Sequence, residues 1–203
     1  MLASHNVSRK AQAMKVLSVS TVGVAGLFAL ALFAMFEQTT TADARTAQTV
    51  VDTEGNLRVP ADYRTSYQFL GSWAVASGVS KSPDQIHVVY ASPGTIIAYL
   101  NDKRFPDGSV LVKEVYQTTT GKMTTGTVSR AQTLKGWFVM VKESKDTHPG
   151  NALWGDGWAW SWFDAGNSQK TTSTNYKVEC LLCHVPARAT DWIYVQGYPE
   201  LKR

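Results

Sequence analysis

The stretch FPDGSVLVKEVYQ, residues 105–117, carries the clearest structural signal in the chain. Its Pro-Asp-Gly segment is turn chemistry, and the run Ser109–Gln117 that follows is rich in the β-branched and aromatic residues of strands. Because side chains alternate along a strand, Lys113 shares one face with Leu111 and Val115, whereas Glu114 lies on the other face. The stretch therefore predicts a turn followed by a strand with apolar residues on both faces.

Three further β-like runs surround this stretch and are separated from it by turn residues. They are Gln85–Tyr90, Leu134–Lys142 and Trp154–Phe163. Asp146–Gly150 has the composition of a turn between the last two runs. Two segments have helical features: Ser92–Leu100, with Ser92 as N-cap and Pro93 at the first helical position, and more weakly Asn175–Cys183. Together they predict an α+β fold, a single domain built on an antiparallel β-sheet with a few helices.

The run Trp154–Phe163 alternates large and small side chains. As a single strand it would place the indoles on one face and the small residues on the other. An indole face usually packs in a core. A face of small residues either packs in the same ordinary way or lets a flat cofactor or another strand approach closely. The residues are Trp154, Trp158, Trp160 and Trp162 against Gly155, Gly157, Ala159 and Ser161.

Composition and charge exclude several classes of protein. The chain has 203 residues, 44% of them apolar and 18% charged, which rules out wholesale disorder. The formal net charge of +4 is spread along the chain without a long basic run, so we expect no nucleic-acid partner. The chain contains two cysteines, which excludes a scaffold dense in disulfides.

The N-terminal residues read as an export segment. Residues 1–15 carry basic side chains and no acid, which predicts that this end stays in the cytoplasm. Residues 16–36 carry no charge and are long enough to cross a bilayer, which takes about 20 apolar residues. They are either an anchor in the inner membrane or a signal peptide cleaved near Ala42-Asp43-Ala44. Residues 37–58 read as a linker and 59–203 as the exported domain, which we expect in the periplasm.

The motif Cys180-Leu181-Leu182-Cys183-His184 is the signature of covalent haem c attachment. Its spacing lets two thiols add to the two haem vinyl groups while the adjacent imidazole reaches the iron. The alternatives are a thioredoxin-like redox pair, a zinc half-site and a structural disulfide. A redox pair would need a βαβ context, and a zinc site would need two more soft ligands, although the chain has no further cysteine.

The sequence marks no strong second ligand for the iron. No methionine follows His184, and nothing distinguishes the upstream Met123 or Met140 as a ligand. His5 falls on the cytoplasmic side, His148 lies in a turn, and His87 alternates with apolar neighbours in a predicted strand. We therefore expect a five-coordinate iron with an open face, which binds small molecules rather than only passing electrons.

With these residues the chain resembles the cytochrome P460 family of haem proteins, from about Val59 to Leu201. The run at 105–114 is a more specific part of this resemblance than the Cys-x-x-Cys-His motif. Further matching segments are Val59–Arg64, His87–Tyr90, Pro149–Asn151, Thr190–Trp192 and Tyr198-Pro199.

The resemblance implies a single haem c held by Cys180 and Cys183, with His184 as the iron ligand. The family's lysine corresponds to Lys113, whose amine would bond covalently to the haem macrocycle. From the residues alone two behaviours of Lys113 remain open: a buried neutral amine, or a side chain that extends to solvent.

The activity that the resemblance implies is oxidation of hydroxylamine or a related small nitrogen compound, with electrons passed to a partner cytochrome. His87 occupies the strand on which ammonia-oxidiser members carry an arginine; it titrates near neutral pH and could manage substrate protons. A related branch, similar to cytochrome c′-beta, lacks the cross-link and binds nitric oxide without turnover. Simple electron transfer is a third possibility. Members of the family are usually homodimers.

Overall fold

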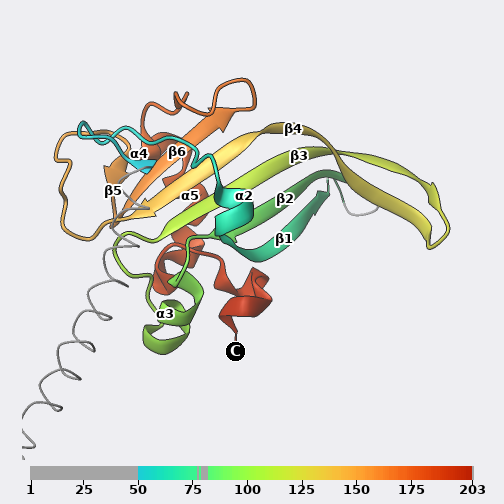
Figure 1. Ribbon diagram of the computed structural model, residues 1–203, viewed down its shortest axis with the longest axis horizontal. Helices are drawn as coiled ribbons and strands as arrows, with labels where there is room; N and C mark the ends of the chain where they lie inside the picture. Colours follow the sequence, from blue (N-terminus) through green and yellow to red (C-terminus); the bar gives the residue numbers. More distant parts are fainter. Residues whose placement is uncertain (1–49, 77, 79–81, 203) are drawn as a thin grey trace, which may run out of the picture. The chain divides into compact units, whose positions relative to one another are not determined.

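The computed structural model describes residues 50–76, 78 and 82–202 (Figure 1). These residues form one six-stranded antiparallel sheet in the order β1-β2-β3-β4-β6-β5, which confirms the predicted α+β class. The predicted export segment, residues 1–36, lies outside the described residues. Among those that are described, no helix is both long and apolar enough to span a membrane.

The sheet contains two long central strands, β3 and β4, with shorter strands on either side. Its members are β1 Gln68–Ala76, β2 Pro83–Ala91, β3 Val110–Met123, β4 Gly126–Lys142, β5 Trp154–Gly155 and β6 Trp158–Asp164. The helices are α2 Tyr63–Ser66, α3 Thr95–Asp102, α4 Tyr176–Glu179 and α5 Leu181–His184. Three short 3₁₀ helices follow, Val185–Thr190, Val195–Gly197 and Pro199–Leu201.

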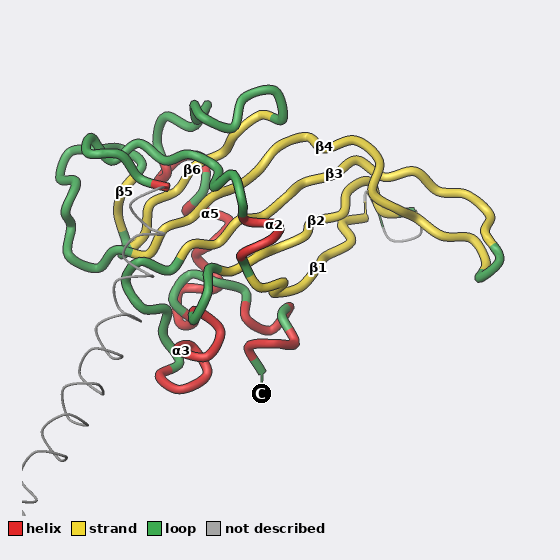
Figure 2. Tube along the Cα trace, in the orientation of Figure 1, coloured by secondary structure: helices red, strands yellow, loops and turns green. Residues whose placement is uncertain are grey.

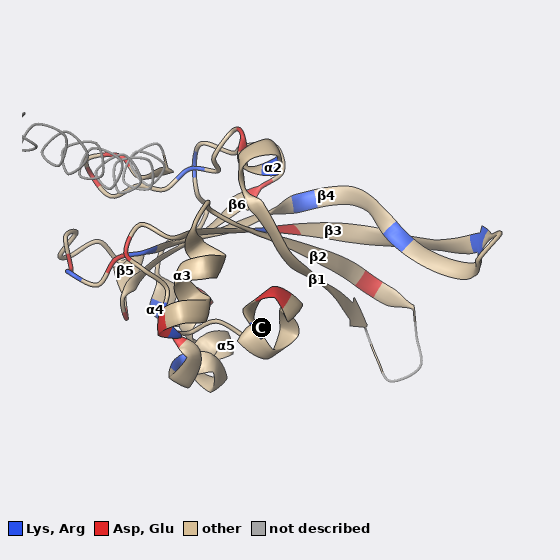
Figure 3. Cartoon of the chain, turned by 60° about the horizontal axis from the view of Figure 1, so that its bottom comes forward, with Lys and Arg blue, Asp and Glu red and all other residues tan. Residues whose placement is uncertain are grey.

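Each face of the sheet has its own hydrophobic core. One core contains Leu111, Met140 and Trp160, which are cross-strand neighbours, together with residues of α3 and of the chain after β6. The other contains Val112 and Val139 with residues from α2 and the segment before it. Figure 3 shows α3, α4 and α5 on one side of the sheet and α2 on the other. The alternation of side chains along β3 therefore serves two packing layers.

The strands extend beyond the predicted runs. The strands β3 and β4 continue as a hairpin beyond the other strands, with a turn between Met123 and Gly126 (Figure 2). This part is rich in threonine and has few buried residues, so it gave no alternation of apolar residues to detect. Strand β1 was not predicted either, because Phe69 is exposed and Gly71 marks a shift in register.

The prediction of one strand over Trp154–Phe163 is wrong. Asp156 and Gly157 both have positive φ angles, 55° and 80°, and form a tight turn between β5 and β6. An Asp-Gly pair suits this turn because both central residues must adopt left-handed backbone. Trp154 therefore stands on a different strand from Trp158. Of the small residues, Ala159 is fully buried in the core that contains Val112, whereas Ser161 lines the cavity described below.

The helix predictions are correct in place but not in their ends. Helix α3 begins at Thr95 with Gly94 as its N-cap, so Ser92 and Pro93 precede it. The Ser92 hydroxyl instead accepts a hydrogen bond from the Val110 amide at 2.9 Å and so ties the start of β3. The weaker segment forms two separate turns, α4 and α5, interrupted at Cys180.

The described end of the predicted linker packs as part of the domain. Val50 and Leu57 are buried in the core beneath α2, and Val51 forms a bridge to Leu57. The Arg58 amide donates to the Val50 carbonyl at 2.8 Å. Residues 50–58 of the segment 37–58 therefore do not form a free tether.

Candidate functional site

A cavity of about 540 Å³ lies over the face of the sheet that carries Leu111 and Lys113. Its floor follows one row of cross-strand neighbours, in which Lys113 lies between Val89 and Phe138, and Phe138 is paired with Trp162. Its other walls come from α4, α5 and the chain around Ile193–Tyr198. A concave, mostly apolar site of this size is typical of pockets for small molecules and cofactors.

The two cysteines and the histidine of the motif all line this cavity. Cys180 separates α4 from α5, and α5 carries Cys183 and His184, so the three side chains have the i, i+3, i+4 spacing that shares one side of a helix. Both thiols are free, which rules out the structural disulfide in this structure. Burial raises the pKa of the Cys180 thiol to about 11, so this thiol is protonated at neutral pH.

The His184 imidazole is held by one backbone hydrogen bond. Its Nδ1 lies 2.6 Å from the Trp192 carbonyl oxygen, which can only accept, so Nδ1 carries the proton and Nε2 has a free lone pair. The ring also packs edge-to-face on Trp160, with 4.9 Å between ring centroids. Burial lowers the pKa of His184, which favours the neutral ring needed by a metal ligand.

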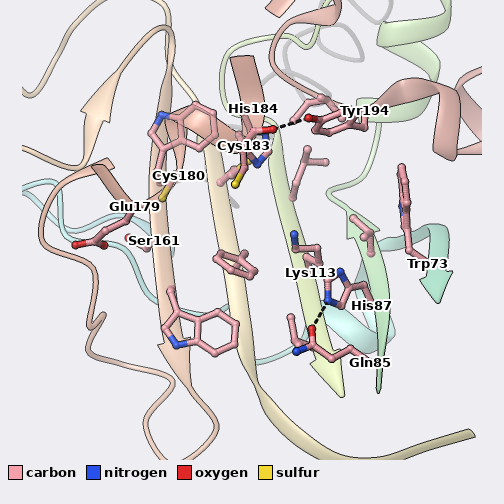
Figure 4. A pocket seen from close by; sticks show the side chains of 18 of the residues that line it. Trp73, Gln85, His87, Lys113, Ser161, Glu179, Cys180, Cys183, His184 and Tyr194 are labelled. Carbon is pink, nitrogen blue, oxygen red and sulfur yellow. Dashed lines mark hydrogen bonds between the residues drawn. The ribbon is translucent and has the colours of Figure 1, made fainter. Parts of the chain in front are cut away.

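The Lys113 amine projects into the same cavity. In Figure 4 its side chain lies between the Cys183–His184 end of the site and His87. Its Nζ is 4.3 Å from the centroid of the Phe138 ring, and no carboxylate pairs with it among the residues described. Desolvation by burial lowers the pKa of Lys113, opposed by the two cysteines. Of the two behaviours left open by the sequence, the structure shows the buried amine.

His87 lines the cavity beside Lys113 and is oriented by a neighbour on its own strand. Its Nε2 lies 2.9 Å from the Gln85 side-chain oxygen, so Nε2 donates and Nδ1 is left as an acceptor (Figure 4). Burial, and then the charge of Lys113, lower the pKa of His87 to about 4. The expectation that His87 titrates near neutral pH is therefore wrong, because the ring is desolvated.

The other candidate iron ligands differ in whether they line the cavity. Met140 lines the cavity and is buried, whereas Met123 stands at the exposed end of β3. His148 packs on Trp154, with 4.3 Å between ring centroids, and does not line this cavity. His5 lies outside the described residues.

A protein-family model matches most of the domain that carries this cavity. The model, described as Cytochrome P460, covers residues 60–195, which is more than half of the chain. The chain belongs to the cytochrome P460 family. Membership indicates a haem c-type cytochrome and confirms the resemblance seen in the sequence. A search of curated proteins finds no match.

The residues of this cytochrome P460 domain fit a haem. The cavity is apolar enough for a porphyrin, and two unpaired thiols and a His184 Nε2 lone pair reach it from one helical segment. Lys113 is half-buried and adds an amine on the floor of the cavity, and among the described residues no carboxylate pairs with it. In the described part of the chain, no three His, Cys, Asp or Glu side chains gather as ligands of a bare metal ion.

Several residues that shape this site carried no signal in the sequence. Trp73, Tyr194 and Tyr198 line the cavity from β1 and the C-terminal 3₁₀ segments. The Tyr194 hydroxyl donates to the Cys183 carbonyl, which ties the motif to its wall. Gln85 could have been found from its spacing, because residues i and i+2 of a strand share a face. The Trp192 carbonyl is a backbone atom and has no signature.

Proposed function

We propose that this cytochrome P460 domain holds one haem c through Cys180 and Cys183 and oxidises hydroxylamine or a related small nitrogen compound. The observation that carries the proposal is the position of Lys113, whose amine is buried in the cavity that also receives Cys180, Cys183 and His184. A plain electron carrier has no use for a buried amine on this floor. When bound, the haem supplies a redox-active iron with an open position for a small nitrogen ligand.

The side chains of the motif hold the group without any redox step. Each thiol S–H would add across a vinyl C=C, so that a C–S bond and a C–H bond form and nothing is oxidised. The His184 Nε2 lone pair would bind the iron, while the Trp192 carbonyl keeps the proton on Nδ1.

The amine of Lys113 would form a further bond to a carbon of the macrocycle. This C–N bond would replace one C–H and one N–H bond, and the two electrons and two protons would pass to an oxidant of the peroxide class, which is reduced to water. Burial favours the neutral amine, which is the nucleophilic form. The added nitrogen changes the electronics and shape of the ring, which are the levers a protein has over its haem.

His87 accepts protons from the bound nitrogen compound. Oxidation of hydroxylamine to nitric oxide releases three electrons and three protons, and Nδ1 of His87 is the acceptor that Gln85 leaves available. A cationic Lys113 depresses the pKa of His87. Conversion of this amine to a conjugated, uncharged nitrogen therefore raises the basicity of His87 and couples the cross-link to proton removal.

Capture of nitric oxide without turnover is the second candidate, and one observation favours it. Val89, Leu111, Val115 and Phe138 give the cavity an apolar surface, which suits an uncharged diatomic ligand better than a polar one. A periplasmic location, a homodimer and a partner cytochrome as electron acceptor belong to the proposal as well.

The experiment that separates these functions uses the full chain matured with haem. A tryptic map should show the Lys113 peptide joined to the haem peptide, and the reduced protein should have a strongly red-shifted Soret band. Hydroxylamine should then reduce a one-electron acceptor dye. A free Lys113 peptide with an ordinary c-type spectrum would favour gas capture, and a low-spin six-coordinate spectrum would indicate electron transfer.

The pH dependence of turnover tests the role of His87. Because its pKa is lowered to about 4, the neutral acceptor persists well below the ordinary value of 6.5. The kcat profile, which reports groups in the substrate complex, should show no acid limb from His87 near pH 6.5. His87→Gln should lower kcat about 10²-fold or more, whereas His148→Asn should leave it unchanged. A limb near pH 6.5 that disappears in His87→Gln would contradict the lowered pKa, and an unchanged kcat in His87→Gln would contradict the role of His87 as proton acceptor.

A further inference from the structure

The loop that supplies the acceptor of His184 has an unusual backbone. Asp191 and Trp192 are consecutive residues with φ angles of 57° and 68°, both in the left-handed region. Asp tolerates this region, but a bulky residue such as Trp is a real outlier there. The conformation turns the Trp192 carbonyl to within 2.6 Å of His184 Nδ1. Surrounding contacts must hold a backbone of this kind in place.

Asp191 is fixed by three contacts that converge from distant parts of the chain. Its Oδ1 accepts from Lys142 Nζ at 2.7 Å, and its Oδ2 from the Phe105 amide at 3.3 Å. Its backbone carbonyl accepts from Trp158 Nε1 at 3.0 Å. The ion pair is well shielded, since the Lys142 and Asp191 side chains are 11% and 17% exposed. The loop is thereby tied to the ends of β4 and β6.

The other side of the loop is closed by Thr190. Its hydroxyl lies 2.7 Å from the Ile193 carbonyl and 3.0 Å from the Ala187 carbonyl. The Trp192 amide donates to the same Ala187 carbonyl at 2.9 Å. The Trp192 carbonyl is thus held on both sides, and the Lys142–Asp191 ion pair is the charged part of this support.

We propose that the Lys142–Asp191 ion pair is a positioning device for the iron ligand, which sets the electron donation of His184 through the Trp192 carbonyl. A short hydrogen bond from Nδ1–H raises the basicity of Nε2. A more basic axial ligand stabilises ferric over ferrous iron and so lowers the reduction potential. The proposal rests on His184 as the axial ligand but not on which small molecule is the substrate.

The test compares Asp191→Asn and Lys142→Met in the matured, haem-loaded full chain. Two quantities are measured: the reduction potential and the iron–histidine stretching band of the ferrous protein in resonance Raman spectra. Loosening the loop lengthens the bond from Nδ1 to Trp192, so both variants should lower the stretching frequency and raise the potential. The double variant should differ little from either single variant, because both remove one interaction.

The pair of variants separates this device from a simple charge effect. Removing the negative charge of Asp191 would raise the potential through space, but removing the positive charge of Lys142 would lower it. Shifts of the same sign in both variants therefore support positioning, and shifts of opposite sign overturn it. Lys142→Arg, which keeps the pair, should restore values near wild type.

A matched control is Asp107→Asn, because Asp107 also holds a loop, accepting from the Ser144 amide at 2.9 Å and from the Ser144 hydroxyl at 2.7 Å. Among the described residues, no hydrogen bond joins the Asp107 side chain to residues 190–193. Asp107→Asn should change neither the reduction potential nor the iron–histidine stretching frequency. If Lys142→Met does not fold, Lys142→Gln supplies the same comparison. If the iron–histidine band lies at the same frequency in Asp191→Asn and in wild type, the positioning role is overturned, but His184 is still the ligand. Absence of an iron–histidine band in wild type overturns His184 as ligand and this proposal with it, and failure of hydroxylamine turnover bears on neither.

Discussion

Lys113→Met is expected to abolish the cross-linked peptide and the red-shifted Soret band while leaving haem attached through Cys180 and Cys183. Methionine fits the apolar floor between Val89 and Phe138 but has no amine to bond to the macrocycle. Hydroxylamine turnover should fall about 10²-fold or more, a loss comparable with misplacing a reacting group. Mass mapping of tryptic peptides and acceptor-dye kinetics measure the two effects on one preparation.

A second lysine provides the control for this experiment. Lys135 also lines the cavity, but its side chain is exposed at the rim. Lys135→Met should keep the cross-linked peptide, the Soret band and turnover within about twofold of wild type, as expected for a surface change. Full turnover in Lys113→Met would show that the amine has no part in the chemistry, even if the haem stays bound.

Glu114→Ala is expected to have the largest effect on stability. Glu114 is 2% exposed and lies on the face of β3 opposite to Lys113. It accepts hydrogen bonds from the Tyr63 hydroxyl and from Arg64 Nε at 2.6 Å, and Trp137 Nε1 donates to the same Tyr63 hydroxyl at 2.8 Å. The network joins α2 to β3 and β4. Removing the carboxylate leaves the buried Tyr63 hydroxyl without its acceptor and the exposed Arg64 without its ion-pair partner.

The free energy of unfolding should fall by about 3 kcal/mol, because breaking a buried charged network costs more than an exposed one. For a domain of this size the melting temperature should drop by roughly 6–12 °C. Urea unfolding followed by circular dichroism measures the loss. The exposed Glu54 gives a comparison, since Glu54→Ala should change stability by less than about 0.5 kcal/mol. An equal loss in both variants would contradict the importance of the buried network, and the Lys113 cross-link should form in both.

The parts of the fold that could be predicted from the sequence were the strands whose side chains alternate in a regular pattern between the two faces. The runs Gln85–Tyr90, Ser109–Gln117 and Leu134–Lys142 bury side chains on one or both faces and appear as β2, β3 and β4. Strand β1 was missed because its exposed residues break the pattern, with Phe69 55% and Val75 40% exposed. Hydrogen bonding to β2, the next strand along the chain, forms this strand, and such backbone pairing leaves no apolar pattern in the residues of β1.

Turn chemistry explains the clearest error. Regular spacing of tryptophans suggested one strand through residues 154–163, yet the Asp156-Gly157 pair within it is among the strongest hairpin signals. The even spacing of the tryptophans hides a change of face, because Trp154 is paired with Ala159 and so lies on the face opposite to Trp158. Attention to the turn residues would have separated β5 from β6 and shown that the indoles of Trp154 and Trp158 do not share a face.

The sequence predicted the residues that carry the chemistry of the candidate site, but not the residues that hold them in place. Covalent attachment requires two thiols and an imidazole at fixed spacing, so Cys180, Cys183 and His184 can be found in a sequence. Lys113 was found through a family resemblance, and the structure adds that its amine is buried. Asp191 acts through hydrogen bonds to residues of distant segments, Lys142 and Phe105, which no spacing rule identifies.

The order of elements along the chain has a consequence for maturation. Every strand of the sheet precedes the attachment motif, since β6 ends at Asp164 and the thiols follow at Cys180 and Cys183. During synthesis from the N-terminus, the floor of the cavity therefore emerges before the residues that we propose attach the haem. If the thiols attach the haem, the sheet that receives it can assemble before attachment, and a truncated product lacking the last segment would have this surface but could not retain the haem.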